Sequence, residues 1–206
     1  FEESVFKGLM IASVSVVIAV LVAIILVIAL RGASSLSLSM LIETPKGGYY
    51  LGKGGGIANA IVGSLYLSLG ASILSFLLSL PIAFALQKEY TGRHLTNVTR
   101  LALDILWGTP SIVYGAFGFT LMLWLGMRAS LLAGIITLAL LELPIMARAM
   151  DEAIAMVPCA LKEASYALGA TRLETALKVV VRQTAPGLLT AILLAFVFSG
   201  VVGISF

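Results

Sequence analysis

The best candidates for chemistry in this chain are hydrogen-bond donors. Arg148 offers a guanidinium, and Thr109, Ser111 and Tyr114 offer hydroxyls around Pro110. Donors of these types could line a passage for an anion, because oxyanions are held by arginine, hydroxyl and backbone N–H groups. Two simpler interpretations compete with this one. Arg148 could anchor the cytoplasmic end of a membrane span, and the hydroxyls could only satisfy backbone groups where a proline breaks a helix.

Catalytic groups are sparse. Asp104 and Glu142 are the only carboxyl groups inside long apolar runs, where an ionisable side chain is costly and is therefore a functional candidate. The chain has one histidine, His94, and one cysteine, Cys159, too few for a catalytic pair or a metal cluster within the apolar runs. An intramembrane enzyme would have to use Asp104 and Glu142 together. We expect no catalytic residues, no metal site and no enzymatic activity in the chain itself.

Residues 158–182 predict a helical hairpin. Pro158 is typical of the first turn of a helix, and Gly169 is typical of the left-handed position that ends one. Thr171 and Glu174 match a capping box, in which each side chain satisfies a free amide at the start of a second helix. The same segment could instead lie as an amphipathic linker on the membrane surface.

The composition indicates which kind of fold positions these residues. Of 206 residues, 60% are hydrophobic and 11% are charged, and the mean hydropathy is +1.10. A soluble domain is about 25% charged and could not bury so much apolar surface at this size. We therefore predict an all-α, polytopic transmembrane helical bundle. Runs of about 20 or more apolar residues predict five spans, at residues 8–30, 57–86, 101–127, 129–147 and 183–206.

Basic residues predict the orientation of the spans. If the N-terminus is cytoplasmic, nine of the 13 Lys and Arg residues lie inside and four lie outside. Residues 151–182 are then the main cytoplasmic segment. We divide the chain into residues 1–56, with the first span and a Ser- and Gly-rich outer loop, and residues 57–206, with the remaining spans. Residues 47–54 nearly match a phosphate-binding P-loop but lack its magnesium-binding Ser or Thr, so we expect no nucleotide site.

The predicted hairpin resembles a known family. Glu163, Ala164 and Ser165, followed after three residues by Gly169, are similar to the EAA signature of ABC-importer permeases. In that family the signature forms a short helix that docks in a cleft of a cytoplasmic ATPase. Ser165 replaces the usual second alanine with another small residue, so close docking stays possible. The resemblance implies an ATPase-coupling set of Glu163, Ala164, Ser165, Gly169, Ala170 and Thr171.

Other segments resemble phosphate-importer permeases of the PstA type. The most specific is GTPSIVYG at residues 108–115, and GGIANAIVGS at residues 55–64 is similar to the start of their core region. The sequences LPIMAR, LGATR and PGLLT continue the resemblance, which covers about residues 55–194. It implies a translocation pathway whose candidate residues are Asn59, Thr109, Ser111, Tyr114 and Arg148.

The chain also departs from this family. Arg182 stands where a proline is usual at the exit of the second hairpin helix, although Pro186 and Gly187 just beyond could still break that helix. Residues 195–202 read AFVFSGVV and lack the Gly-Arg and Gly-acid pairs that members usually carry there. Compared with this family, we expect the sixth span to be missing and the fifth to be truncated.

The resemblance implies a type I ABC-importer permease that forms half of a pathway for inorganic phosphate. Its implied partners are a second permease of the PstC type, two PstB-type ATPases that bind ATP and magnesium, and a PstS-type phosphate-binding protein. The chain would lie in the inner membrane among lipids, hold no cofactor of its own and bind no nucleic acid. Permeases for molybdate, sulfate or phosphonate share the hairpin and stay as alternatives, as does a degenerate fragment that does not transport.

Overall fold

The protein is helical throughout the part that the structure describes. In a computed structural model of the chain, no strand occurs among the described residues, which confirms the predicted all-α class. Lys46, the P-loop-like residues 47–54, Lys88 and Arg128 lie outside the described part. The described residues are 2–33, 36–45, 55–87, 89–126 and 130–203.

The chain divides into two compact units, residues 1–59 and 60–206. In the first unit, α1 (Glu2–Gly32) is long and apolar enough to cross a membrane, and its apolar side chains are exposed. Residues 32–56 were predicted to be loop, but they contain the short helix α2 (Leu38–Ile42). This helix forms because the Ser37 hydroxyl accepts a hydrogen bond from a free amide in its first turn.

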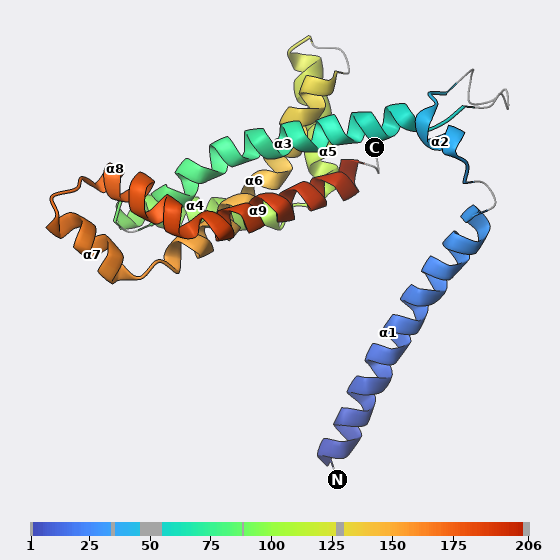
Figure 1. Cartoon of the computed structure of the whole chain (residues 1–206), viewed down its shortest axis with the longest axis horizontal. Helices are drawn as coiled ribbons and strands as arrows, with labels where there is room; N and C mark the ends of the chain where they lie inside the picture. The colour runs from blue at the N-terminus through green and yellow to red at the C-terminus, as the bar shows by residue number, and fades with distance from the viewer. Residues whose placement is uncertain (1, 34–35, 46–54, 88, 127–129, 204–206) are drawn as a thin grey trace. The chain divides into compact units, whose positions relative to one another are not determined.

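The second unit is built around three long helices, α3 (Ala58–Ala85), α6 (Leu131–Ala155) and α9 (Val181–Gly203). In Figure 1, α3 and α9 run along the long axis of the picture, and α6 crosses from the top down to α9. Their shared core places Met146 and Met150 of α6 against Ala83 of α3 and Ala191 of α9. Small residues on the outer two helices let them approach the bulky side chains of α6. Such close packing holds helices together in a membrane, where hydrophobic burial gives no advantage.

The third predicted span is not one helix. It is broken into α4 (Arg93–Trp107) and α5 (Ser111–Trp124), which meet at 99°. Pro110 has no amide hydrogen and keeps Thr109 out of the helical conformation, so the helix ends before it. The 14 residues of α5 extend only about 21 Å at ~1.5 Å per residue, less than the ~30 Å hydrocarbon core. The chain therefore has four candidate spans, or five if α4 and α5 count as one.

The prolines inside the other long helices do not break them. The helices α6 and α9 continue through Pro144 and Pro186, although Pro186 was expected to break the second hairpin helix. Pro144 is completely buried, and the Ser79 hydroxyl of α3 donates to the neighbouring Leu143 carbonyl at 3.2 Å. The carbonyl that loses its helical donor to Pro144 is that of Leu140, four residues earlier, so the Ser79 contact at Leu143 holds α6 against α3 and does not replace the lost hydrogen bond.

The segment predicted to be cytoplasmic, residues 151–182, includes the last turns of α6, which continues to Ala155, and the first turns of the long helical run that begins at Arg172. Within the last turns of α6, Asp151 is paired with Arg100 of α4 at 3.2 Å. Residues 156–171 lie between the two long helices.

The helical hairpin in this segment is present. The helix α7 (Cys159–Ala167) follows Pro158 and ends at Gly169, which has a φ of 82°. The Gly169 amide donates to the Tyr166 carbonyl and the Ala170 amide to the Ser165 carbonyl, the two hydrogen bonds of a Schellman motif. The capping box of Thr171 then starts α8 (Arg172–Glu174). A short π-helix, η3 (Thr175–Val180), joins α8 directly to α9.

We predict that Gly169→Ala destabilises the protein. A side chain in the left-handed conformation costs about 1–2 kcal/mol, so the thermal unfolding midpoint in detergent should fall. Gly63→Ala is the matched control, because a Cβ added there contacts nothing and alanine favours a helix. Equal midpoints for the two variants would contradict the role given to the Gly169 turn.

Candidate functional site

The hairpin presents an exposed face at one end of the bundle formed by α3, α6 and α9 (Figure 1). Glu163, Ala164 and Gly169 are exposed, and Leu168 is 89% exposed at the tip. The predicted coupling residues Ala170 and Thr171 follow in the turn itself. The small residues Ala164 and Gly169 leave the backbone of the tip accessible beside Leu168.

The two helices of the hairpin are joined to each other. Ser165 is half-buried, and its hydroxyl lies 2.9 Å from the hydroxyl of Thr175, which is completely buried in η3. The capping box adds a hydrogen bond from the Glu174 amide to Thr171 Oγ1 at 3.3 Å and one from the Thr171 amide to Glu174 at 3.0 Å. The turn is therefore tied to the start of the helix that becomes the last span.

Glu89 fastens the hairpin to the segment between α3 and α4. Its carboxylate accepts from the buried Lys162 ammonium at 2.9 Å, and its carbonyl accepts from Arg172 at 3.0 Å. Sequence reasoning missed this anchor. Glu89 and Lys162 are 73 residues apart, and no motif or spacing connects residues so distant in the chain.

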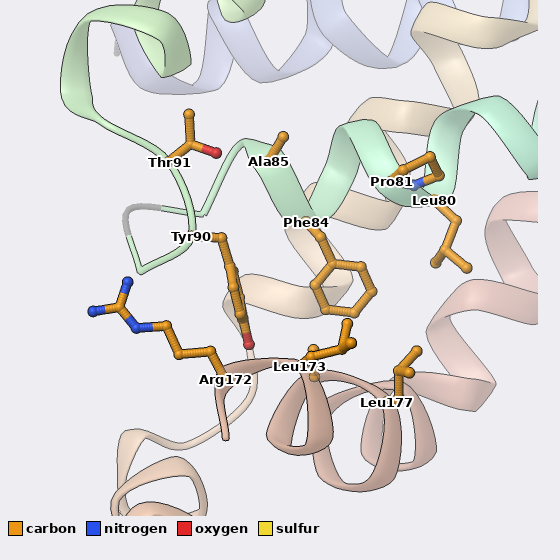
Figure 2. Close-up of a pocket in the computed structure, with 10 residues that line it drawn as sticks. Leu80, Pro81, Phe84, Ala85, Tyr90, Thr91, Arg172, Leu173 and Leu177 are labelled. Carbon is orange, nitrogen blue, oxygen red and sulfur yellow. The ribbon is translucent and has the colours of Figure 1, made fainter. Parts of the chain in front are cut away.

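A largely apolar cavity of about 520 Å³ lies beside this anchor. Figure 2 shows Phe84 and Tyr90 on one side of it and Leu173 and Leu177 on the other, with the Arg172 side chain extending away at the edge. The two aromatic rings meet edge to face, with centroids 5.7 Å apart. Burial first, and then the nearby Tyr166 and Glu89, raise the pKa of Tyr90 to about 12, so this phenol stays neutral at physiological pH.

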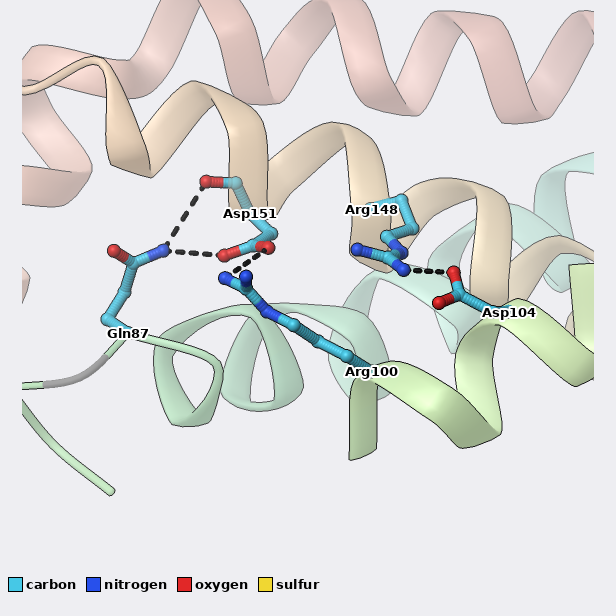
Figure 3. Close-up of polar contacts among 5 residues, drawn as sticks. All are labelled: Gln87, Arg100, Asp104, Arg148 and Asp151. Atoms are coloured by element: carbon cyan, nitrogen blue, oxygen red, sulfur yellow. Dashed lines mark hydrogen bonds and ion pairs between the residues drawn. The ribbon is translucent and has the colours of Figure 1, made fainter. Parts of the chain in front are cut away.

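The charged side chains of α4 and α6 pair with each other (Figure 3). Arg148, the predicted anion-facing residue, forms an ion pair with Asp104. About one turn of helix further on, Asp151 accepts from Arg100 at 3.2 Å and from Gln87 at 2.7 Å. Asp104 and Arg148 are both accessible, with 58% and 28% of their side chains exposed. Arg148 could therefore meet an anion only if its pairing with Asp104 loosened.

The hydroxyls around Pro110 have different surroundings. Thr109 and Ser111 both line a cavity of about 310 Å³ where the broken third span meets Pro144 and Phe198. Thr109 also donates to the Ile105 carbonyl, and Tyr114 donates to the Leu106 carbonyl, both at 2.9 Å. These two hydroxyls thus satisfy backbone groups at the end of α4, as the simpler interpretation expects.

The pathway candidates do not all belong to one compact unit. Asn59 lies exposed in the first turn of α3 and belongs to the first compact unit, whereas the others belong to the second. Across the described residues, no group of three or more His, Cys, Asp or Glu side chains is placed to hold a metal ion. The arrangement offers an exposed hairpin surface, ion pairs between helices and apolar cavities beside them.

Comparisons with known proteins agree on one family. A family model described as binding-protein-dependent transport system inner membrane component matches residues 78–206. The PstA phosphate transport permease of Yersinia pestis is 37% identical over 166 residues, which are 80% of this chain and 55% of that protein. PstA 1 of Mycobacterium tuberculosis is 39% identical over 142 residues, 68% of this chain and 46% of that protein. The chain thus spans about half the length of these relatives.

The fold has solved counterparts. The MetNI methionine ABC transporter, in inward-facing conformations, matches with a TM-score of 0.64 at 23% identity, over 70% of this chain and 69% of that one. At this identity the likeness concerns the fold alone. Since the family model covers more than half of the sequence, the chain belongs to the binding-protein-dependent transport system inner membrane components, as an ABC permease similar to the PstA proteins.

Proposed function

We propose that this protein is a permease subunit of an ATP-driven importer of inorganic phosphate and that its hairpin is the contact for a cytoplasmic ATPase. The observation that carries the coupling role is the exposed tip at Leu168, next to Glu163 and Ala164 on a hairpin that is otherwise tied down. The substrate rests on the similarity to phosphate transport permeases named PstA.

The hairpin can transmit force because it is continuous with the last span. The capping box at Thr171 starts a helical run in which α8, η3 and α9 follow one another without a gap. A push on the turn therefore moves the whole candidate span from Arg172 to Val201. The contacts of Glu89 with Lys162 and Arg172 pass the same motion to α3 and α4.

Phosphate import needs an energy source outside this chain. An anion entering a cell moves against the inside-negative potential, at about 2.3 kcal/mol per charge per 100 mV. We place ATP and magnesium on two PstB-type ATPases and propose a PstC-type permease and a PstS-type binding protein as the other partners. The N-terminus then lies in the cytoplasm and the spans in the inner membrane, with its lipids around them.

We predict that Leu168→Asp and Glu163→Lys each lower phosphate uptake at least tenfold. Leu168→Asp places a negative charge on an apolar part of the proposed docking face, and Glu163→Lys reverses a charge there. The ATPase should therefore fail to copurify, while the amount of permease in the membrane stays normal. Cys159→Asp is the matched control. It adds the same charge to the same hairpin, at an exposed position in the first turn of α7, where an acid is favourable. Normal uptake by both hairpin variants would refute the coupling role.

The Asp104–Arg148 pair can be tested by exchanging its charges. If Arg148 meets phosphate, Arg148→Gln should reduce uptake by about tenfold or more, equivalent to ~1.4 kcal/mol. The double variant Asp104→Arg with Arg148→Asp should insert into the membrane normally but take up phosphate no faster than Arg148→Gln. If the exchanged pair instead restores uptake to the wild-type rate, the two residues only hold α4 against α6. Labelled phosphate is the substrate, and excess unlabelled sulfate or molybdate should not compete.

A further inference from the structure

Glu142 is the one described carboxyl group in the middle of the bundle, and neither the coupling hairpin nor the ion pairs use it. Its side chain in α6 is completely buried, and neither carboxyl oxygen has a hydrogen-bond partner of normal geometry among the described residues. An ionised carboxylate without a partner in such surroundings would cost several kcal/mol. The burial therefore favours the neutral acid.

The charged groups of the neighbouring helices do not compensate Glu142. Arg148, six residues further along α6, lies about 9 Å away along the helix axis and is paired with Asp104. In α9, Arg182 lies at the opposite end from Ser199.

The other helices near Glu142 offer no cation close to it. Neither α3 nor α5 contains a charged residue. Their two tyrosines are Tyr66, which is exposed, and Tyr114, which donates to the Leu106 carbonyl. The remaining titratable groups of α4 and α6 are Arg93, His94, Arg100, Asp151 and Glu152, the last two beyond Arg148.

Serine hydroxyls from two other helices surround this carboxyl group. Ser72 of α3 and Ser199 of α9 face Glu142, and they are 4% and 0% exposed. Ser68 and Ser75 lie one turn to either side of Ser72 on α3, also buried and without hydrogen-bond partners. Buried hydroxyls are rare without partners, so Ser72, Ser199 and the acid that they face constitute a polar site within an apolar bundle.

The direction of one hydrogen bond determines where a proton is required. The Ser199 hydroxyl donates its only hydrogen to the Phe196 carbonyl at 3.0 Å. Toward Glu142, Ser199 can therefore offer only an oxygen lone pair, which a carboxylate would repel and a carboxylic acid would bind. Ser72 has no partner, so its hydroxyl is able to donate to the other oxygen of the acid.

We propose that Glu142, Ser72 and Ser199 form a proton-binding site inside the membrane that joins α3, α6 and α9. The proton resides on Glu142, whose O–H donates to Ser199 while its carbonyl oxygen accepts from Ser72. Complete burial leaves room for a proton but not for a hydrated metal cation. Any motion that separates the three helices would admit water and release the proton. The site does not depend on the proposed transport of phosphate.

The test is infrared spectroscopy of the permease, purified with the subunits that accompany it and reconstituted in lipid nanodiscs. At neutral pH the wild type should show the carbonyl band of a protonated carboxyl group. Glu142→Gln should lose this band, and Asp104→Asn, which removes an exposed carboxyl group, should keep it. Ser199→Ala should shift the band to higher frequency, because the acid loses its acceptor.

Thermal unfolding provides a second measurement. The native state would retain a proton that the unfolded chain releases, so the wild-type midpoint should fall as the pH rises. The unfolding midpoint of Glu142→Gln should equal the midpoint that the wild type shows at low pH, and it should change less with pH. The reason is that an amide has a hydrogen-bond donor and an acceptor, as the neutral acid has. Absence of the band in the wild type, its persistence in Glu142→Gln, or failure of Glu142→Gln to fold would each overturn the proposal.

Discussion

The left-handed turn at Gly169 is the constraint on which the proposed coupling depends. Its two backbone hydrogen bonds end α7, and the capping box at Thr171 begins the next helix two residues later. Only Ala170 separates this turn from Thr171, the residue that caps the next helix. A loose linker at this point would absorb a displacement by bending, whereas this turn must pass it on to α9.

Carboxyl groups in the second unit differ in whether a cationic side chain lies beside them. Near the hairpin end of the bundle, two acids have cationic partners, Asp151 in Arg100 and Glu89 in Lys162. In the middle of the bundle, Glu142 has only hydroxyls. A buried acid can stay ionised when a cationic partner compensates its charge. Without such a partner it takes up a proton and is neutral. The same physics thus gives ion pairs at the end and a neutral acid at the centre.

The prolines demonstrate how far context decides local structure. Pro110 follows Gly108 and Thr109, and the helix before it ends with the Tyr114 and Thr109 hydroxyls satisfying its last carbonyls. Pro144 lies between packed helices, where the Ser79 hydroxyl bonds the adjacent carbonyl, and α6 continues. One proline therefore creates the bend that lines a cavity, and the other is accommodated inside a span.

The sequence by itself determined the all-α membrane class, the approximate position of most of the spans and the local structure of the hairpin. These features depend on runs of apolar residues and on short-range spacings, such as the one between Thr171 and Glu174, whose effects act within a few residues. Only the tertiary structure decided that Arg148 pairs with Asp104, that Glu89 anchors Lys162 and that Glu142 faces two serines. These contacts join residues 44 to 73 positions apart or lie between separate helices, because which faces of the helices meet is decided by packing and not by any local pattern.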